Sequence, residues 1–289
     1  MILIIGGNGY VGKAFQRHLM ERNESFKVLS RTEVDYYHVG TLIEVIRQAK
    51  PSFIINAAGY TGKPNVDACE QHKHDCLLGN AVLPGIIREA CEATQTSWGH
   101  ISSGCIYTGK RPDGQGFNET DPPNFCFRTG PSSFYSGTKA LGEEVLDDAR
   151  NCYIWRLRIP FDHRDGPRNY LTKLQRYDRL LEAENSISHL DDFVSACLAC
   201  WTKRVPFGCY NVTNSGAITT REVTELIRKH RGREQAFKFF KNEAEFMEKA
   251  AQTPRSNCVM ANQKLLQAGI EIREVNEAVE DALRKWQPE

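Results

Sequence analysis

Four side chains in the middle of the sequence have the types and spacing of an acid–base site. Ser103 follows a short apolar run, Cys105 comes two residues later, and Tyr135 and Lys139 are four residues apart. Positions four apart lie on one face of a helix, so Lys139 is expected to sit near Tyr135 and to lower the pKa of its phenol. Such a tyrosine can exchange a proton with an oxygen that Ser103 also holds. The Tyr-x-x-x-Lys pattern alone fits an ordinary surface helix equally well, so its meaning depends on the elements around it.

The chain opens with an apolar run, a glycine-rich turn and an amphipathic stretch. Residues 1–5 are typical of a central parallel strand, and a G-x-x-G-x-x-G run follows. In a strand–turn–helix context such glycines let the backbone approach a pyrophosphate, which the helix N-terminus attracts. The residues predicted to bind the cofactor here are Gly6, Gly9, Tyr10, Val11 and Gly12.

The end of the next strand bears on which dinucleotide would bind. Residues 26–31 are expected to form this strand and its exit, where an NAD site usually carries an acid for the ribose hydroxyls. Ser30 and Arg31 occupy that place instead. A guanidinium suits a 2′-phosphate, so the sequence favours NADPH over NADH, although a solvated surface arginine fits the same pattern. Asp35 and Tyr36 follow, where an acid can meet the adenine amine.

Strands and helices then alternate as far as Pro160. Further strands are expected at 52–56, 96–103 and 153–159, and helices at 41–50, 65–94 and 134–148. This alternation predicts an α/β fold with a doubly wound, Rossmann-like parallel sheet. Ligands of such sheets bind at the carboxyl ends of the strands, where the small-residue run after Asn56 and the hydroxyl of Ser103 both lie.

The pattern changes after residue 160. Helices are expected at 169–181 and 191–202, a strand at 208–212, a capping box at Thr219 that starts a helix ending at Arg231, a small strand at 237–240 and helices at the end. We therefore predict two domains. Residues 1–161 with about 186–212 would bind NADP, and about 162–185 with 213–289 would form a smaller, mostly helical substrate domain.

Composition excludes several other classes of protein. The net charge of +1 indicates neither a nucleic-acid nor a membrane partner, no apolar run is long enough to span a bilayer, and no signal peptide is evident. A cytoplasmic location is expected, with the ten scattered cysteines as free thiols. Cys197 and Cys200 are expected in the core. Cys69, His72 and Cys76 have the spacing of one helix face and lack a fourth ligand, so no metal site is predicted.

With these elements in order, the chain resembles the extended short-chain dehydrogenases/reductases. Over nearly its whole length it is similar to the epimerase/reductase domain of nucleotide-rhamnose synthases. The motifs that carry this likeness are Gly62-Lys-Pro-Asn-Val-Asp67, Glu70-Gln-His-Lys73, Gly104-Cys-Ile106, Phe134-Tyr-Ser136, Pro167-Arg-Asn169, Thr172-Lys173 and Pro254-Arg-Ser-Asn257. Val66-Asp-x-x-Glu70 is shared with bacterial dTDP-4-dehydrorhamnose reductases, and Ser102-Ser-Gly-Cys105 is similar to GDP-fucose synthase. Ser103 replaces a threonine of the plant proteins, and Ala68 replaces a tryptophan.

The resemblance implies a two-part reaction on a UDP- or dTDP-linked 4-keto-6-deoxyglucose. C3 and C5 would be epimerised, with Cys105 as the base and Lys173 as its partner, and C4 would then be reduced with NADPH by Ser103, Tyr135 and Lys139, giving nucleotide-L-rhamnose. A buried strand cysteine and a solvated helix lysine are the plainer interpretations of Cys105 and Lys173. Two rival functions also fit: a monofunctional 4-keto reductase in which Cys105 is inert, and a non-catalytic NADP-binding regulatory subunit. A homodimer is left open.

The remaining site residues follow from the strand ends and the resemblance. The further cofactor contacts are expected at Ser30, Arg31, Asp35, Tyr36, Asn56, Ala57, Ala58, Tyr60, Lys139 and Pro160. Substrate contacts are expected at Thr61, Gly62, Lys63, Asn65, Asn80, Asn169, Arg255 and Asn257, with Arg255 holding the substrate pyrophosphate.

Overall fold

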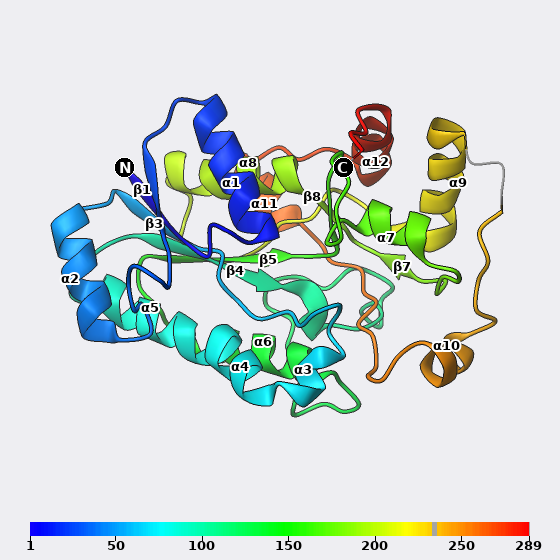
Figure 1. Cartoon of the computed structure of the whole chain (residues 1–289), viewed down its shortest axis with the longest axis horizontal. Helices are drawn as coiled ribbons and strands as arrows, with labels where there is room; N and C mark the ends of the chain where they lie inside the picture. The colour runs from blue at the N-terminus through cyan, green and yellow to red at the C-terminus, as the bar shows by residue number, and fades with distance from the viewer. Residues whose placement is uncertain (233–235, 289) are drawn as a thin grey trace.

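The computed structural model describes residues 1–232 and 236–288. A six-stranded sheet in the order β2-β1-β3-β4-β5-β9 forms its centre (Figure 1), and every pairing in this sheet is parallel. Its strands are β1 (Ile2–Ile5), β2 (Phe26–Leu29), β3 (Phe53–Asn56), β4 (Trp98–Ser103), β5 (Cys152–Leu157) and β9 (Gly208–Asn211). β1, β3 and β5 are buried throughout, as parallel strands covered on both faces must be. The doubly wound α/β prediction is confirmed.

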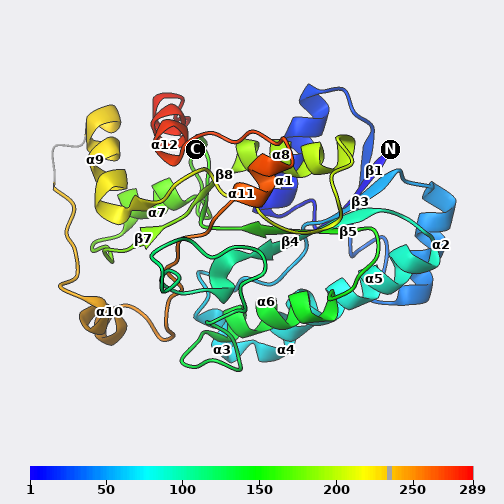
Figure 2. The ribbon, with the colours of Figure 1, turned by 180° about the vertical axis from the view of Figure 1, so that it is seen from behind.

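Helices cover both faces of the sheet (Figures 1 and 2). One face carries α1 (Tyr10–Glu21), α8 (Leu190–Thr202) and α11 (Gln263–Gln267). The other carries α2 (Val39–Ala49), α3 (Ala68–Gln71), α4 (Lys73–Leu77), a π-helical turn (Leu78–Val82), α5 (Leu83–Ala93) and α6 (Phe134–Val145). The long helix expected at 65–94 is thus a chain of shorter segments, with Pro84 near the start of α5, directly after the π-helical turn.

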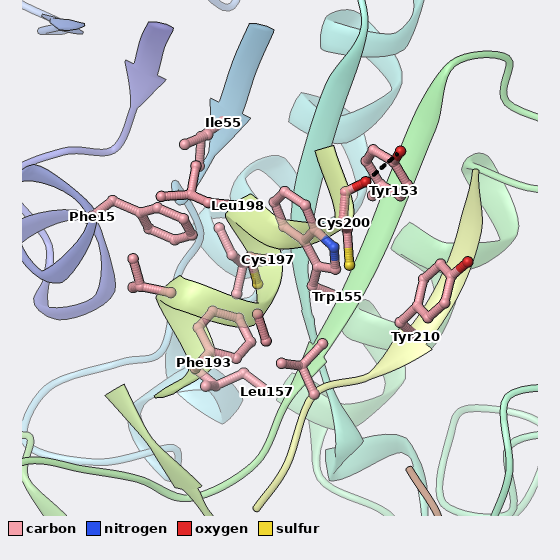
Figure 3. Packing of buried hydrophobic residues seen from close by; sticks show 14 of the residues in the cluster. Phe15, Ile55, Tyr153, Trp155, Leu157, Phe193, Cys197, Leu198, Cys200 and Tyr210 are labelled. Carbon is pink, nitrogen blue, oxygen red and sulfur yellow. Dashed lines mark hydrogen bonds between the residues drawn. The ribbon is translucent and has the colours of Figure 1, made fainter. Parts of the chain in front are cut away.

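The two CxxC cysteines lie in the core between α8 and the sheet, as predicted. Figure 3 shows Cys197 and Cys200 among Phe15, Trp155 and Phe193, and both cysteines are fully buried. The Tyr153 hydroxyl donates a hydrogen bond of 3.0 Å to the Cys200 carbonyl oxygen, drawn as a dashed line. These thiols therefore fill space as small apolar groups.

Residues after β5 build a separate core cluster. Phe161, Leu171, Ile187, Val223 and Val279 are among its members, and all are almost fully buried. The elements here are β6 (Pro160–Phe161), α7 (Tyr170–Arg176), β7 (Glu184–Asn185), β8 (Ser188–His189), β10 (Ile218–Thr219), α9 (Thr220–Arg231), α10 (Glu243–Lys249) and α12 (Val275–Arg284). The mostly helical character is as expected, and the exact domain bounds stay a prediction. No helix in the described part of the chain is long and apolar enough to cross a bilayer.

Three local predictions in this region can be compared with the structure. The capping box at Thr219 and Glu222 is present and starts α9. The helix expected at 169–181 ends earlier, at Arg176, because Tyr177 is extended and the chain turns so that Leu180 can pair with Phe239. That single bridge, with hydrogen bonds on both sides of Leu180, is all that forms of the strand expected at 237–240.

Candidate active site

The glycine turn lies where the strand order changes direction, between β1 and β3. Gly6 has a φ of +78°, and a Cβ there would lie 2.3 Å from the Ala58 amide nitrogen. A Cβ on Gly12 would lie 2.3 Å from the Gly6 carbonyl oxygen. Gly9 precedes α1 without a side-chain cap, so the first N–H groups of this twelve-residue helix are left for another acceptor. The turn is thus a cradle suited to a diphosphate.

The predicted adenosine side of the cofactor site follows β2. Ser30 shares a hydrogen bond of 2.6 Å with the Thr32 hydroxyl, and Arg31 is exposed and close enough to Tyr37 for its charge to act on that phenol. Asp35 accepts a hydrogen bond from the Tyr37 amide. Tyr36 instead lies in the core, 5 % exposed, which gives its ring a packing role.

Tyr10, Val11 and Pro160 are the remaining residues predicted to contact the cofactor near α1 and β6. Val11 is half-buried against the core under α8, and Pro160 begins β6, paired with Ser188. The Tyr10 hydroxyl is buried without a hydrogen-bond partner among the described residues. Burial, together with the Asp162 carboxylate, raises its pKa.

Buried amides shape the loop that follows β3. The Asn56 side chain shares a hydrogen bond of 2.9 Å with His100 Nδ1 and accepts another from the Ala58 amide, so its ends are engaged inside the protein. Asn80 lies in the π-helical turn and both accepts from and donates to the Tyr60 backbone, at 2.9 and 2.8 Å. Ala57, between these residues, is half-buried. Asn80 was predicted to contact the substrate. In the structure its side chain supports the loop after β3, which carries predicted cofactor and substrate residues.

Ser103, Tyr135 and Cys105 lie together. Ser103 ends β4, and its hydroxyl is close enough to the Tyr135 hydroxyl and the Cys105 thiol to favour their charged forms, although burial raises the pKa of both groups. The Cys105 amide also donates to Ser103 Oγ at 3.2 Å. Cys105 follows the strand and lies in a 3₁₀ turn (Gly104–Ile106). That turn, and not strand alternation, brings the thiol back to Ser103.

The pKa of Tyr135 was expected to be lowered by Lys139, but its overall shift is in the opposite direction. Burial raises the pKa of the Tyr135 phenol well above its ordinary value, and the nearby Cys105 adds to this. Lys139 is itself almost fully buried, which lowers the pKa of its ammonium, and its Nζ donates to the Ile101 carbonyl at 3.2 Å. A Cβ on Gly59 would lie 3.5 Å from this Nζ, so Lys139 reaches the loop after β3. Desolvation therefore outweighs the charge that the i, i+4 spacing suggested.

The predicted substrate residues of the C-terminal part differ in burial and in their hydrogen-bond partners. Lys173 lies half-buried on α7, and burial, Arg168 and Arg255 all lower its pKa. Asn169 is fully buried, caps α7 and donates to the Asp162 and Arg164 carbonyls, so it orders the loop before the helix. Asn257 is half-buried and accepts a hydrogen bond from Asn185.

The loop with Thr61, Gly62, Lys63 and Asn65 borders a cavity of about 480 Å³. Thr61 and Lys63 are exposed, and Asn65 accepts from the Asp67 amide at 2.8 Å. The cavity is lined by Lys63, Asn65, Asp67 and Gln71 on one side and by residues 248–252 on the other.

Sequence reasoning gave no role to three residues that tie this loop to the rest of the site. Glu70 accepts from the Phe134 amide at 2.7 Å, at the start of the helix that carries Tyr135, and from the Thr253 hydroxyl at 2.9 Å. Asp67 pairs with Arg255, and Arg168 donates to the Gly62 carbonyl. The Val66-Asp-x-x-Glu70 motif was the available signal, but its partners lie far along the chain.

Four potential metal-ligand side chains meet at the start of α8, although no metal site was predicted. Asp162, His163, His189 and Asp191 offer ligand atoms within 4.8 Å of one another. The Asp162 carboxylate is paired with Arg17 and Arg164 at 3.0 and 3.2 Å. These guanidinium groups already neutralise the most buried acid of the cluster, so the arrangement fits an ion-pair network.

Comparison with known proteins matches the chain to one family. The model of the RmlD substrate binding domain matches residues 1–287. The chain is 34% identical over 244 residues to the bifunctional dTDP-4-dehydrorhamnose 3,5-epimerase/dTDP-4-dehydrorhamnose reductase of Arabidopsis thaliana, covering 83% of this chain and 78% of the relative. It is 36% identical over 230 residues to the trifunctional UDP-glucose 4,6-dehydratase/3,5-epimerase/reductase RHM3 of the same plant, 78% of this chain but 33% of the relative. The chain thus spans only about a third of the trifunctional relatives.

Two solved structures share the fold. The UDP-rhamnose synthase L780 of Acanthamoeba polyphaga mimivirus has a TM-score of 0.89 at 23% identity and 98% coverage of both chains. The dTDP-4-dehydrorhamnose reductase of Bacillus anthracis, solved with NADP, has a TM-score of 0.81 at 19% identity, covering 99% of this chain and 97% of that one. From the match over residues 1–287 and the 34% identity to a relative covered over most of its length, the chain belongs to the RmlD substrate binding domain family.

Proposed function

We propose that this chain epimerises C3 and C5 of a UDP- or dTDP-linked 4-keto-6-deoxyglucose and reduces C4 with NADPH, giving nucleotide-L-rhamnose. The observation that carries the proposal is that Ser103, Tyr135 and Cys105 lie together at the end of β4. This arrangement joins two hydroxyls that can hold a ketone oxygen to a thiol that can exchange a proton beside it. The bifunctional Arabidopsis relative, whose name carries both activities, supports the same assignment.

The glycine cradle fits the diphosphate of NADPH. Gly6, Gly9 and Gly12 leave room for the phosphates and expose the N-terminus of α1 to them. Arg31, exposed after β2, would pair with the 2′-phosphate. The bound cofactor would supply the hydride that reduces C4.

Reduction needs one proton on the ketone oxygen. Burial raises the pKa of Tyr135, so at neutral pH its side chain is a phenol and can donate that proton. Ser103 would hold the oxygen in place from the neighbouring position, and both hydrogen bonds strengthen as the oxygen gains charge. The Lys139 ammonium, near Gly59, would add positive charge on the cofactor side.

Epimerisation needs a base on one face of the sugar and an acid on the other. The 4-keto group acidifies the hydrogens at C3 and C5, and Cys105 and Lys173 are the two groups we assign. From the sequence Cys105 was the base. Burial, however, raises the pKa of the Cys105 thiol, whereas burial and two arginines lower the pKa of Lys173. We therefore propose the reverse order, in which Lys173 takes the proton and the Cys105 thiol returns one to the opposite face.

The buried Cys105 also favours one alternative, a reductase that receives an already epimerised sugar. NMR of the products from protein, NADPH and UDP-4-keto-6-deoxyglucose separates the two, with the dTDP sugar in parallel. L-rhamnose on the nucleotide supports the bifunctional enzyme. Reduction without inversion at C3 and C5 leaves the monofunctional reductase, and absence of any NADPH oxidation with either sugar contradicts both. A cytoplasmic location and a homodimer remain expectations from the sequence.

A further inference from the structure

Three basic side chains from different parts of the chain gather at the loop after β3. The Arg168 guanidinium, just before α7, donates a hydrogen bond of 2.7 Å to the Gly62 carbonyl oxygen. Arg255, close to the end of the chain, is bound to Asp67 on the same loop. Lys173 on α7 lies near enough to both arginines for their charges to act on its ammonium. One short loop, residues 62–67, therefore holds both arginines.

Positive charge exceeds negative charge at this place. The hydrogen bond of Arg168 goes to a neutral carbonyl, and both Arg168 and Lys173 lack a carboxylate partner in the described part of the chain. Asp67 compensates Arg255 alone. Arg168, Lys173 and Arg255 are each half-buried, and charges removed from water are normally paired. The Arg168 guanidinium, which is always charged and has no carboxylate partner there, therefore calls for an anionic ligand group beside Arg255.

We propose that Arg168, together with Arg255, binds the diphosphate of the nucleotide-sugar substrate. This inference rests on the proposed function for the kind of substrate, and it adds Arg168 to the contact predicted from the sequence. The Gly62 carbonyl fixes one nitrogen of the Arg168 guanidinium, and the remaining donors of that planar group can take phosphate oxygens in a bidentate manner.

The experiment measures binding and not turnover. Dissociation constants for UDP and UMP, and for dTDP and dTMP, are determined by calorimetry with the wild type, Arg168→Met, Arg168→Lys and a control, Arg176→Met. The control removes the same charge from α7, where Arg176 pairs with Asp165. We expect the wild type to prefer the diphosphate in at least one pair. Arg168→Met should raise the dissociation constant of that diphosphate by about 10-fold, as the loss of one charge-assisted contact implies. It should change the dissociation constant of the monophosphate far less. Arg168→Lys should fall in between, and Arg176→Met should match the wild type.

If Arg168 only supports the loop through the Gly62 carbonyl, its loss should weaken binding of the monophosphate and of the diphosphate equally. That result overturns the proposal. So does wild-type affinity of Arg168→Met for both diphosphates, or a wild type without preference for either diphosphate. The proposed reaction fails separately, because inactive protein that still shows the Arg168-dependent preference leaves the diphosphate site intact.

Discussion

Arg255 and Asp67 are joined by two parallel hydrogen bonds, of 2.6 Å from Nη1 to Oδ1 and 2.7 Å from Nη2 to Oδ2. The pair connects the loop after β3 to a segment from the far end of the chain. Both side chains are largely buried, at 20% and 14% exposure. Next to it, Glu70 holds Thr253 and the start of α6. The acids of the Val66-Asp-x-x-Glu70 motif thus fasten the C-terminal segment over the helix that carries Tyr135.

The first prediction concerns the pH dependence of this pair. Hydrogen bonds and the charge of Arg255 lower the pKa of Asp67 in the folded protein despite its burial. The pair therefore stabilises the fold above the ordinary aspartate pKa of about 3.9, and this contribution is lost as the pH falls through the lower, folded-state value. Asp67→Asn should lower the free energy of unfolding at pH 7 by about 1 kcal/mol, and the difference should shrink towards pH 3.

Urea denaturation at pH 7, 4 and 3 measures this effect. Asp75→Asn serves as the control, since Asp75 is exposed and pairs only with the exposed His74 among the described residues. A deficit of Asp67→Asn that stays the same at all three pH values would show that the carboxylate charge is not involved.

The second prediction concerns the choice of cofactor. Arg31 is exposed at the end of β2, where a 2′-phosphate would lie. Arg31→Asp replaces an attraction by a repulsion, so the KM for NADPH should rise by about 10²-fold while that for NADH changes little. Arg22→Asp, at the exposed end of α1, is the charge-matched control. Equal kinetic parameters of the wild type with both cofactors would sink this assignment.

The third prediction concerns the proton donor. Tyr135→Phe keeps the ring and removes the hydroxyl, so kcat for reduction should fall by about 10²-fold or more while NADPH binding is kept. Because the pKa of Tyr135 is raised above its ordinary value, the wild-type rate should not decline through loss of this proton below pH 10. Near-normal reduction by the variant, measured as NADPH oxidation, would exclude Tyr135 as the donor.

Periodicity was enough to predict the sheet because its signals are local. Apolar runs such as Ile2–Ile5 and Phe53–Asn56 are short, buried and bounded by small residues, and each became a central strand. The region after Pro160 was harder. Its two-residue strands form only through pairing with distant segments, as β10 does with β7, and α7 is cut short at Arg176 by the bridge between Leu180 and Phe239.

The site was predictable where chemistry follows from residue type and adjacency. Ser103, Cys105 and Tyr135 do meet, although the turn at Gly104 was not foreseen. The protonation of Tyr135 and Cys105 was not predictable, because desolvation depends on what the whole fold places around a side chain. For the same reason the link from Asp67 to Arg255, between residues far apart in the chain, carries no local signal.

The last prediction separates the bifunctional enzyme from the plain reductase. If Cys105 and Lys173 exchange protons with C3 and C5, the wild type should incorporate deuterium from heavy water into the 4-keto sugar, which mass spectrometry detects. Lys173→Met should abolish this labelling, because methionine has no amine to accept the proton. Cys105→Ser should abolish labelling with inversion, because a serine hydroxyl is a much weaker acid than a thiol. Both variants should still reduce a sugar epimerised beforehand, since Ser103, Tyr135 and Lys139 are unchanged.

Cys258→Ser is the matched control. This thiol is also buried in the same core cluster and donates to the Gly104 carbonyl at 3.3 Å, but it has no assigned role, so the variant should leave labelling intact. An unlabelled sugar with the wild type would make the protein a reductase only, with Cys105 as a packing residue.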